Sequence, residues 1–245
     1  MKSFGAPFNA AVVGATGGLG RAFGAALLKE AELGRLLLCA RSDPGVTDPR
    51  AAWCRLDLEE EASIAAAAEE AEAAGPLHLV IVASGLLHDG AALQPEKSWR
   101  ALDADALVRA YRINAVGPAL VAKHFLPRLD RDGKSAFAVL TARVGSISDN
   151  RLGGWHAYRA SKAAANMLVR TLSIELARRN PAALCVALHP GTVDTGLSKP
   201  FQGGVPEDKL FTADRSAGHL LQLLDGLGPE DSGRLFAWDG QRIPF

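Results

Sequence analysis

The chain has 245 residues, with 27 Lys and Arg against 27 Asp and Glu and a formal net charge of zero. This balance argues against a nucleic-acid-binding surface or a patch for anionic membranes, and the length suffices for one large domain with a sizeable core. No apolar run reaches about 18 residues and no secretory signal begins the chain, so we expect a cytoplasmic protein without a transmembrane helix.

Apolar strand-like runs alternate with helical segments along the chain. In chain order, the first half is expected to form a strand at 10–13, a helix at 18–33, strands at 35–40 and 53–56, a helix at 59–74 and a strand at 77–83. The second half is expected to form a helix at 103–130, interrupted near Gly117-Pro118, a strand at 136–140, a helix at 155–179, a strand at 183–188, a helix at 213–227 and a strand at 233–238.

This order predicts an α/β protein with a Rossmann-type, doubly wound parallel sheet of about seven strands and helices on both faces. No linker, repeat or low-complexity segment divides the chain, so residues 1–245 are expected to form one domain. Residues 200–211 contain Gly203-Gly204 and Pro206 and are expected to form a mobile loop. The three cysteines, at 39, 54 and 185, lie in apolar runs and are expected to be buried thiols rather than a disulfide framework.

The first expected strand leads into a glycine-rich loop that opens the first helix. Gly14, Gly18 and Gly20 have the spacing G-x-x-x-G-x-G. Glycine allows a sharp turn and the close approach of a pyrophosphate, and the helix N-terminus offers free N–H groups to the phosphates. Because a strand precedes the loop and a helix follows it, the pattern predicts dinucleotide binding rather than a merely tight turn.

The end of the second expected strand bears on which dinucleotide binds. A site that prefers NAD usually has Asp or Glu here, to hold the ribose 2′-hydroxyl. This chain has Ala40 followed by Arg41, and a guanidinium suits a 2′-phosphate, with Arg21 as a second candidate. The sequence therefore favours NADP over NAD. The alternative is that Arg41 is only a solvated loop residue.

Tyr158 and Lys162 stand four residues apart in an alanine-rich helical segment. One turn takes about 3.6 residues, so the phenol and the ammonium lie on the same face. A fixed positive charge lowers the pKa of a phenol from about 10, so the pair is a candidate proton donor or acceptor. The six histidines show no paired metal spacing such as H-x-x-x-H, and no metal site is expected.

Joined to Pro190-Gly191, these motifs resemble the short-chain dehydrogenase/reductase superfamily over nearly the whole chain. Within it, the chain looks like the C-factor-like branch of small carbonyl-reductase relatives. This second resemblance rests on Gly85-Leu86-Leu87-His88, Pro95-Glu96-Lys97-Ser98, Arg143-Val144-Gly145-Ser146-Ile147, the segment from His189 to Thr195, and Trp238-Asp239-Gly240.

The resemblance implies an oxidoreductase that interconverts an alcohol and a ketone or aldehyde. Tyr158 would donate or accept the proton, Lys162 would lower the pKa of the phenol and hold the nicotinamide ribose, and Asn114 would anchor a proton-relay water. With the loop glycines and Arg41, the cofactor-binding residues that it implies are Thr16, Leu19, Asp57, Leu58, Ser84, Gly85, Tyr158, Lys162, Pro190, Gly191, Val193 and Thr195. Relatives pair through the two long helices, so a homodimer or homotetramer is expected.

Two positions depart from the family pattern. The family usually has a serine three residues before Gly145, and this chain has Ala142 there. Either Thr141 or Ser146 is expected to polarise the carbonyl in its place, and we favour Ser146. If neither does so, the missing donor costs about 2.7–4 kcal/mol of transition-state stabilisation. Val82-Ala83-Ser84-Gly85 replaces the usual Asn-Asn-Ala-Gly, a difference that we interpret as structural.

The departure at Ala142 keeps a second hypothesis open: a dinucleotide-binding regulatory or scaffold protein with weak or no turnover. For an enzyme, the substrate pocket is expected to be shaped by Leu152, Trp155 and the loop at 197–211. The apolar content of these residues indicates a hydrophobic or aromatic carbonyl compound.

Overall fold

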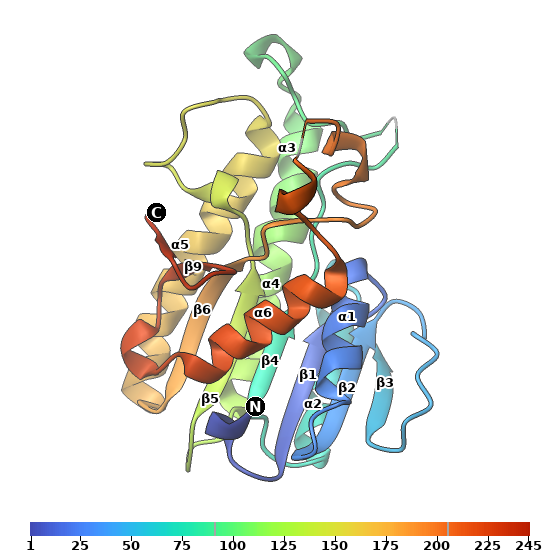
Figure 1. The fold of residues 1–245 in the computed structure, drawn as a ribbon, viewed down its shortest axis with the longest axis vertical. Coiled ribbons are helices and arrows are strands. Elements are labelled where there is room, and N and C mark those ends of the chain that lie inside the picture. The colour runs from blue at the N-terminus through green and yellow to red at the C-terminus, as the bar shows by residue number, and fades with distance from the viewer. Residues whose placement is uncertain (91, 205) are drawn as a thin grey trace.

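The computed structural model describes residues 1–90, 92–204 and 206–245 and has an eight-stranded sheet at its centre (Figure 1). The strand order across the sheet is β10-β9-β6-β5-β4-β1-β2-β3. The strands are β1 (Phe8–Val13), β2 (Leu33–Ala40), β3 (Ala51–Arg55), β4 (Leu79–Val82), β5 (Ser135–Leu140), β6 (Ala183–His189), β9 (Leu235–Ala237) and β10 (Arg242–Ile243). The doubly wound parallel sheet is thus confirmed, and β10 adds an eighth strand, antiparallel to β9, that the sequence analysis missed.

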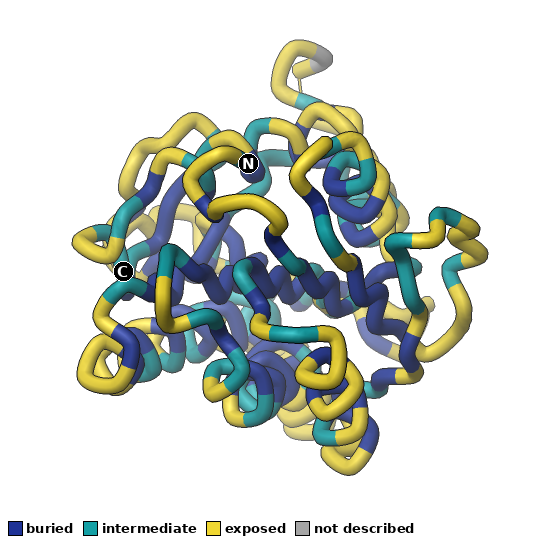
Figure 2. Tube along the Cα trace, turned by 90° about the horizontal axis from the view of Figure 1, so that it is seen from below, coloured by how far each residue is buried: buried dark blue, intermediate teal, exposed yellow. Residues whose placement is uncertain are grey.

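Helices cover both faces of the sheet. The helices are α1 (Gly18–Leu27), α2 (Glu61–Ala73), α3 (Ala104–Tyr111), α4 (Gly117–Phe125), α5 (His156–Arg179) and α6 (Ala213–Gly226). One core layer joins α2, α4 and α5 to the sheet, and the other joins α1 and α6 to the opposite face. Residues of β1 alternate between the layers, with Ala11 and Val13 in the first and Ala10 and Val12 in the second. Figure 2 shows these buried segments in the middle of the molecule and the exposed ones around them.

The interruption expected near Gly117-Pro118 lies earlier in the chain. A π-helical turn occupies Arg112–Val116 between α3 and α4, whereas Gly117 and Pro118 begin α4. Proline is tolerated in the first turn of a helix because its missing N–H needs no partner there. The turn at Arg112–Val116 includes Asn114, and such π-bulges often mark functional sites.

The first helix is shorter than predicted, and the segment expected to be a loop contains structure. The α1 helix ends at Leu27, and Leu33 and Gly34 already belong to β2. A Cβ atom at Gly34 would lie 2.9 Å from Asn9 Oδ1, so this glycine allows the close approach of β1 rather than ending a helix. Two residues of the expected loop, Leu210–Phe211 (β8), pair with Thr192–Val193 (β7).

The described part of the chain has no helix that is both long and apolar enough to cross a membrane. All three cysteines are free and buried, as expected.

Candidate active site

The predicted site segments meet at one edge of the sheet. They follow the carboxyl ends of β1, β2, β3, β4, β5 and β6, which all run parallel. The strand order reverses at β1, whose neighbours are β2 and β4. In open α/β sheets, ligands bind outside the carboxyl ends of the strands at such a reversal.

The glycine loop is packed too tightly for side chains. Gly14 has a φ of +87°, and a Cβ atom there would lie 2.5 Å from Ser84 Oγ. A Cβ atom at Gly20 would lie 2.0 Å from the Gly14 carbonyl oxygen, and one at Gly18 would lie 2.6 Å from Thr195 Cγ2. The loop therefore contacts both Ser84 after β4 and Thr195 after β6.

The N-terminus of α1 fits a pyrophosphate. Its N-cap residue is Gly17, which has no side chain to cap the helix, and the described residues provide no hydrogen-bond acceptor for the N–H groups of Gly18 and Leu19. These groups and the helix dipole favour an anion at this position. The neighbouring Thr16 carbonyl oxygen accepts a hydrogen bond from Arg21 Nε at 3.0 Å.

The residues predicted to hold the adenosine end lie at the carboxyl ends of β2 and β3. Arg41 follows β2 and is exposed. Asp57 is half-buried, and its carboxylate accepts the Glu59 N–H at 3.0 Å. Leu58 is buried and packs against Gly117, where a Cβ atom would lie 2.8 Å from Leu58 Cβ. Leu58 thus also packs against the start of α4.

Asn114 ties the π-turn to the segment after β4 and to α5. Its side-chain oxygen accepts the Leu86 N–H at 2.7 Å, and its Nδ2 donates to the Leu86 carbonyl at 2.8 Å and to Ser161 Oγ at 3.0 Å. The Ser161 hydroxyl donates in turn to the Tyr158 carbonyl at 2.9 Å. Ser161 was not predicted, although it lies one helical turn after Tyr158.

Tyr158 and Lys162 lie on one face of α5, as their spacing predicts. Lys162 Nζ lies 5.8 Å from the centre of the Tyr158 ring and donates to the Leu140 carbonyl at 2.9 Å. Gly85 adjoins both Lys162 and Asn114, with its Cβ position 3.5 Å from Lys162 Nζ. The phenol, the ammonium and Asn114 therefore lie together at the carboxyl ends of β4 and β5.

Burial moves the pKa of both groups toward the neutral form. It raises the pKa of the Tyr158 phenol well above its ordinary value and lowers the pKa of Lys162 to about 8. Removal from water penalises both charged forms. This direction for the phenol is opposite to the lowering expected from Lys162. At neutral pH the phenol keeps its proton and Lys162 keeps its charge.

The pKa of Lys162 predicts a pH-dependent difference in stability between the parent protein and Lys162→Met. Between pH 8 and about 10 the unfolded lysine holds a proton that the folded lysine has lost, so the lysine's destabilising effect fades as the pH rises. The free energy of unfolding of the parent, minus that of Lys162→Met, should therefore increase by about 1 kcal/mol for each pH unit between pH 8 and about 10. Urea unfolding at pH 7, 8, 9 and 10 measures this.

The contributions of Tyr158, Cys39 and Cys185, whose pKa values burial also raises, are common to both proteins and cancel in the difference. A difference that stays constant with pH would contradict the prediction.

Among the described residues, no hydrogen bond joins Ser146 to Tyr158. Ser146 is buried after the short helical turn Arg143–Gly145, and its oxygen accepts the Asp149 N–H at 3.1 Å. Thr141 is also buried, and its hydroxyl has no hydrogen-bond partner in the part of the chain that the structure describes. Ala142, at the usual serine position, is 9% exposed.

Aromatic side chains form one wall beside the phenol. The Trp155 ring lies 6.3 Å from the Tyr158 ring and 5.1 Å from Phe201, and His88 lies 5.7 Å from Phe201 (centroid distances). His88 Nε2 is 3.0 Å from the Gly196 carbonyl oxygen. Trp155 was predicted to shape the pocket, and Leu152 is almost fully exposed. Phe201 belongs to the loop at 197–211, which was also predicted to shape the pocket, whereas His88 was not predicted to lie there.

The segment after β6 packs against α6 and the last strands. Ser216 donates to the Pro190 carbonyl at 2.8 Å, and a Cβ atom at Gly191 would lie 2.9 Å from the Phe211 ring. Val193 is buried in β7. These contacts hold Thr195 against the glycine loop.

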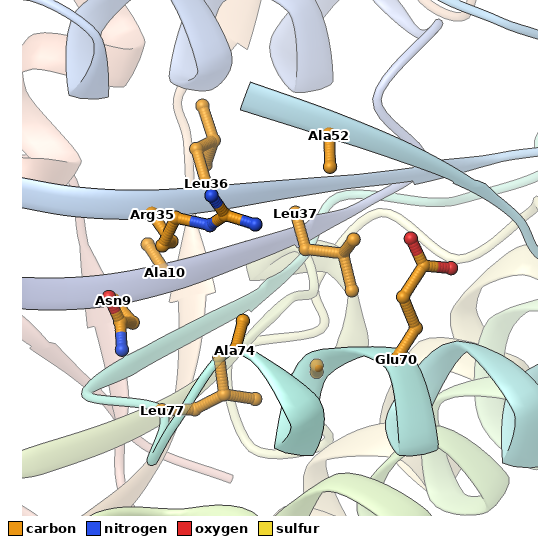
Figure 3. Close-up of a pocket in the computed structure, with 10 residues that line it drawn as sticks. Asn9, Ala10, Arg35, Leu36, Leu37, Ala52, Glu70, Ala74 and Leu77 are labelled. Atoms are coloured by element: carbon orange, nitrogen blue, oxygen red, sulfur yellow. The ribbon is translucent and has the colours of Figure 1, made fainter. Parts of the chain in front are cut away.

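A separate cavity of about 40 Å³ lies near the opposite edge of the sheet (Figure 3). Its wall includes Asn9, Leu36 and Ala52 from the early parts of β1, β2 and β3, and Glu70 from α2. The cavity adjoins none of the predicted site residues and is too small for a dinucleotide.

Known proteins resemble this chain in sequence and in fold. Residues 9–204 match the sequence model of a family described as short chain dehydrogenase. The chain is 39% identical over 150 residues to C-signal of Myxococcus xanthus, covering 60% of this chain and 85% of that protein. It is also 39% identical over 139 residues to 1-hydroxy-2-glutathionyl-2-methyl-3-butene dehydrogenase of Rhodococcus sp., covering 57% of this chain and 58% of the relative.

A solved structure, the NADPH-bound carbonyl reductase from chicken fatty liver, superposes with a TM-score of 0.83 at 26% identity, covering 98% of this chain and 96% of that one.

Proposed function

Because the chain belongs to the short chain dehydrogenase family, we propose that it is an NADP-dependent oxidoreductase that interconverts an alcohol and a ketone or aldehyde. The observation that carries this proposal is that Lys162 adjoins both Gly85 and the Tyr158 ring, at the same sheet edge as the glycine loop. A dinucleotide in that loop and a proton donor on α5 are the two parts that carbonyl reduction needs.

In this proposal, Tyr158 donates its proton to the substrate oxygen during reduction and takes it back during oxidation. A phenol with a raised pKa is fully protonated at neutral pH, which suits the donor role. Lys162 carries the positive charge that stabilises the phenolate formed, and the Leu140 carbonyl holds its ammonium in place. The nicotinamide, when bound, supplies or accepts the hydride. Asn114 and Ser161 hold the start of α5 to the π-turn, and Asn114 anchors the water through which the proton is replaced.

The residues at the sheet edge fit a dinucleotide. The glycine loop would hold the pyrophosphate with Thr16, Gly18, Leu19 and Gly20, and its uncapped helix N-terminus supports this assignment. The remaining contacts that we propose come from Asp57, Leu58, Ser84, Gly85, Pro190, Gly191, Val193 and Thr195, together with Tyr158 and Lys162.

The choice of NADP rests on Arg41. Its side chain is exposed at the end of β2, where the 2′-phosphate of NADP would lie, and the chicken carbonyl reductase of similar fold binds NADPH.

We expect Arg41→Ala to weaken NADPH binding about 10- to 100-fold, equivalent to the 1.5–3 kcal/mol of a hydrogen bond to a charged group, and to leave NADH binding unchanged. Fluorescence titration of parent and variant with both cofactors measures this. Equal losses for the two cofactors would remove the 2′-phosphate role, and binding of neither cofactor by the parent would overturn the enzyme proposal.

The second candidate function is a dinucleotide-binding regulatory or scaffold protein with weak or no turnover. Ala142 favours it, since this chain lacks the usual serine. This function predicts tight cofactor binding without turnover on a broad panel of carbonyl compounds. A measurable rate that depends on Tyr158 would exclude it.

The substrate class and assembly are also proposals. The aromatic wall of His88, Trp155 and Phe201 supports a hydrophobic or aromatic carbonyl substrate. Exposed apolar residues on α3 and α5, namely Val108, Tyr111, Met167 and Ile174, support a homodimer or homotetramer, which sedimentation equilibrium would distinguish. We further propose that the protein acts in the cytoplasm.

A further inference from the structure

Glu96 is a buried acidic residue that the proposed mechanism does not use. It lies in the segment between β4 and α3 and is 5% exposed. Among the described residues, no Lys, Arg or His forms an ion pair with its carboxylate, whose hydrogen-bond donor is the backbone N–H of Ala157, 3.2 Å from each oxygen. A buried carboxylate is costly unless positive charge and hydrogen bonds compensate it. The positive end of the α5 helix dipole and the Ala157 N–H supply this compensation.

The same residue also holds the backbone just before α5. Trp155 precedes the helix in the left-handed conformation, with a φ of 52°, which a bulky residue adopts only when its surroundings impose it. The Trp155 N–H donates to the Glu96 carbonyl at 2.5 Å. Glu96 therefore holds Trp155 with its main chain and Ala157 with its side chain.

The start of α5 has no cap of its own. The side chain of Trp155, its N-cap residue, makes no capping hydrogen bond. Glu96 supplies the missing acceptor from 61 residues earlier in the chain. The Arg159 side chain also ties this turn to the preceding segment, because it donates to the Gly154 carbonyl at 3.0 Å and to the Val144 carbonyl at 3.3 Å. Tyr158 is the next residue after Ala157, so the anchored turn is the one that carries the phenol.

We propose that Glu96 is a positioning residue for Tyr158: it anchors the first turn of α5 and holds the phenol against Trp155 in its half-buried place. The reaction assigned to the phenol rests on the proposed function, whereas the anchoring of the turn by Glu96 does not. Among the described residues, the charged and titratable groups near the turn include His156, Arg159 and Lys162 on α5 and, across Phe201, His88.

The test uses the environment of Tyr158 as well as the rate. The chain has two tyrosines, so Tyr111→Phe leaves Tyr158 as the one phenol that absorbs as a phenolate. In this background, we expect Glu96→Ala to form phenolate at a pH at least about one unit lower than the parent, because the loosened turn admits water and the raised pKa falls. Circular dichroism at each pH confirms that the protein is folded.

The rate gives the second readout. We expect Glu96→Ala to lower kcat about 10- to 100-fold with KM for NADPH unchanged, the size of effect that a misplaced reacting group produces. Glu96→Gln keeps an acceptor oxygen for the Ala157 N–H and should restore most of kcat. Asp103→Ala is the matched control, because Asp103 caps α3 through the Ala106 N–H at 2.8 Å and should leave kcat and the phenol titration unchanged.

Two results would overturn the inference: a folded Glu96→Ala protein whose phenol titrates as in the parent, or an Asp103→Ala protein with the same loss of kcat. If the parent turns over no carbonyl compound but Glu96→Ala still shifts the titration, the proposed function fails and the anchoring of Tyr158 by Glu96 stands.

Discussion

Replacing Tyr158 by phenylalanine should lower kcat about 10²- to 10⁴-fold, the range that a positioned general acid or base contributes. The substitution removes one oxygen atom and keeps the ring that packs 6.3 Å from Trp155. No described residue is hydrogen-bonded to the phenol oxygen, so its removal leaves no buried partner unsatisfied. NADPH affinity and the urea midpoint should therefore stay close to those of the parent. Steady-state kinetics with a hydrophobic ketone, together with a cofactor titration, measure both.

Tyr111→Phe is the control for this experiment, because Tyr111 ends α3 and is 47% exposed. It should retain the full rate. An undiminished rate in Tyr158→Phe would remove Tyr158 from the proton transfer and with it the oxidoreductase assignment. A loss in both variants would point instead to a general sensitivity of the packed helices α3 and α5.

The parts of the site that the sequence predicts are those that depend on local pattern and on parallel strands. Gly14 and Gly20 lie close together in the turn from β1 into α1, where a Cβ atom at Gly20 would lie 2.0 Å from the Gly14 carbonyl oxygen. Tyr158 and Lys162 share a face because a helix repeats every 3.6 residues or so. Parallel strands end at one edge of the sheet, so segments such as Ser84 and Thr195 were expected to meet.

The parts that the sequence does not predict depend on contacts between distant segments. Nothing near Glu96 indicates that its carboxylate binds a helix end 61 residues later. The π-turn at Arg112–Val116 also escaped prediction, because Gly117-Pro118 is the stronger local signal for a break. The raised pKa of Tyr158 arises from burial, which spacing alone does not reveal. A fourth feature that the sequence does not indicate is the hydrogen bond that the Ser146 oxygen accepts from the Asp149 N–H.

Ala142 is the position where one substitution should increase activity. It follows β5 in extended conformation, with φ of −154° and ψ of 150°. It comes one residue after Thr141, whose hydroxyl has no hydrogen-bond partner among the described residues. A serine here would offer an O–H to the substrate oxygen as negative charge develops on it. One such donor stabilises a transition state by about 2.7–4 kcal/mol, so Ala142→Ser should raise kcat by up to about 10²- to 10³-fold. KM for NADPH should not change, because the donor acts on the substrate.

The residues that we propose as replacements decide how much of this gain appears. Ser146 accepts the Asp149 N–H but keeps its own O–H free to donate, and we propose that it polarises the carbonyl weakly in the parent. Ser146→Ala should then lower kcat in the parent and have little effect once Ala142→Ser is present, whereas Thr141→Val should leave both rates unchanged. No gain in Ala142→Ser together with a large loss in Thr141→Val would assign the donor to Thr141. If no variant in the set turns over a carbonyl compound although each binds NADPH, the dinucleotide-binding regulatory function replaces the enzyme proposal.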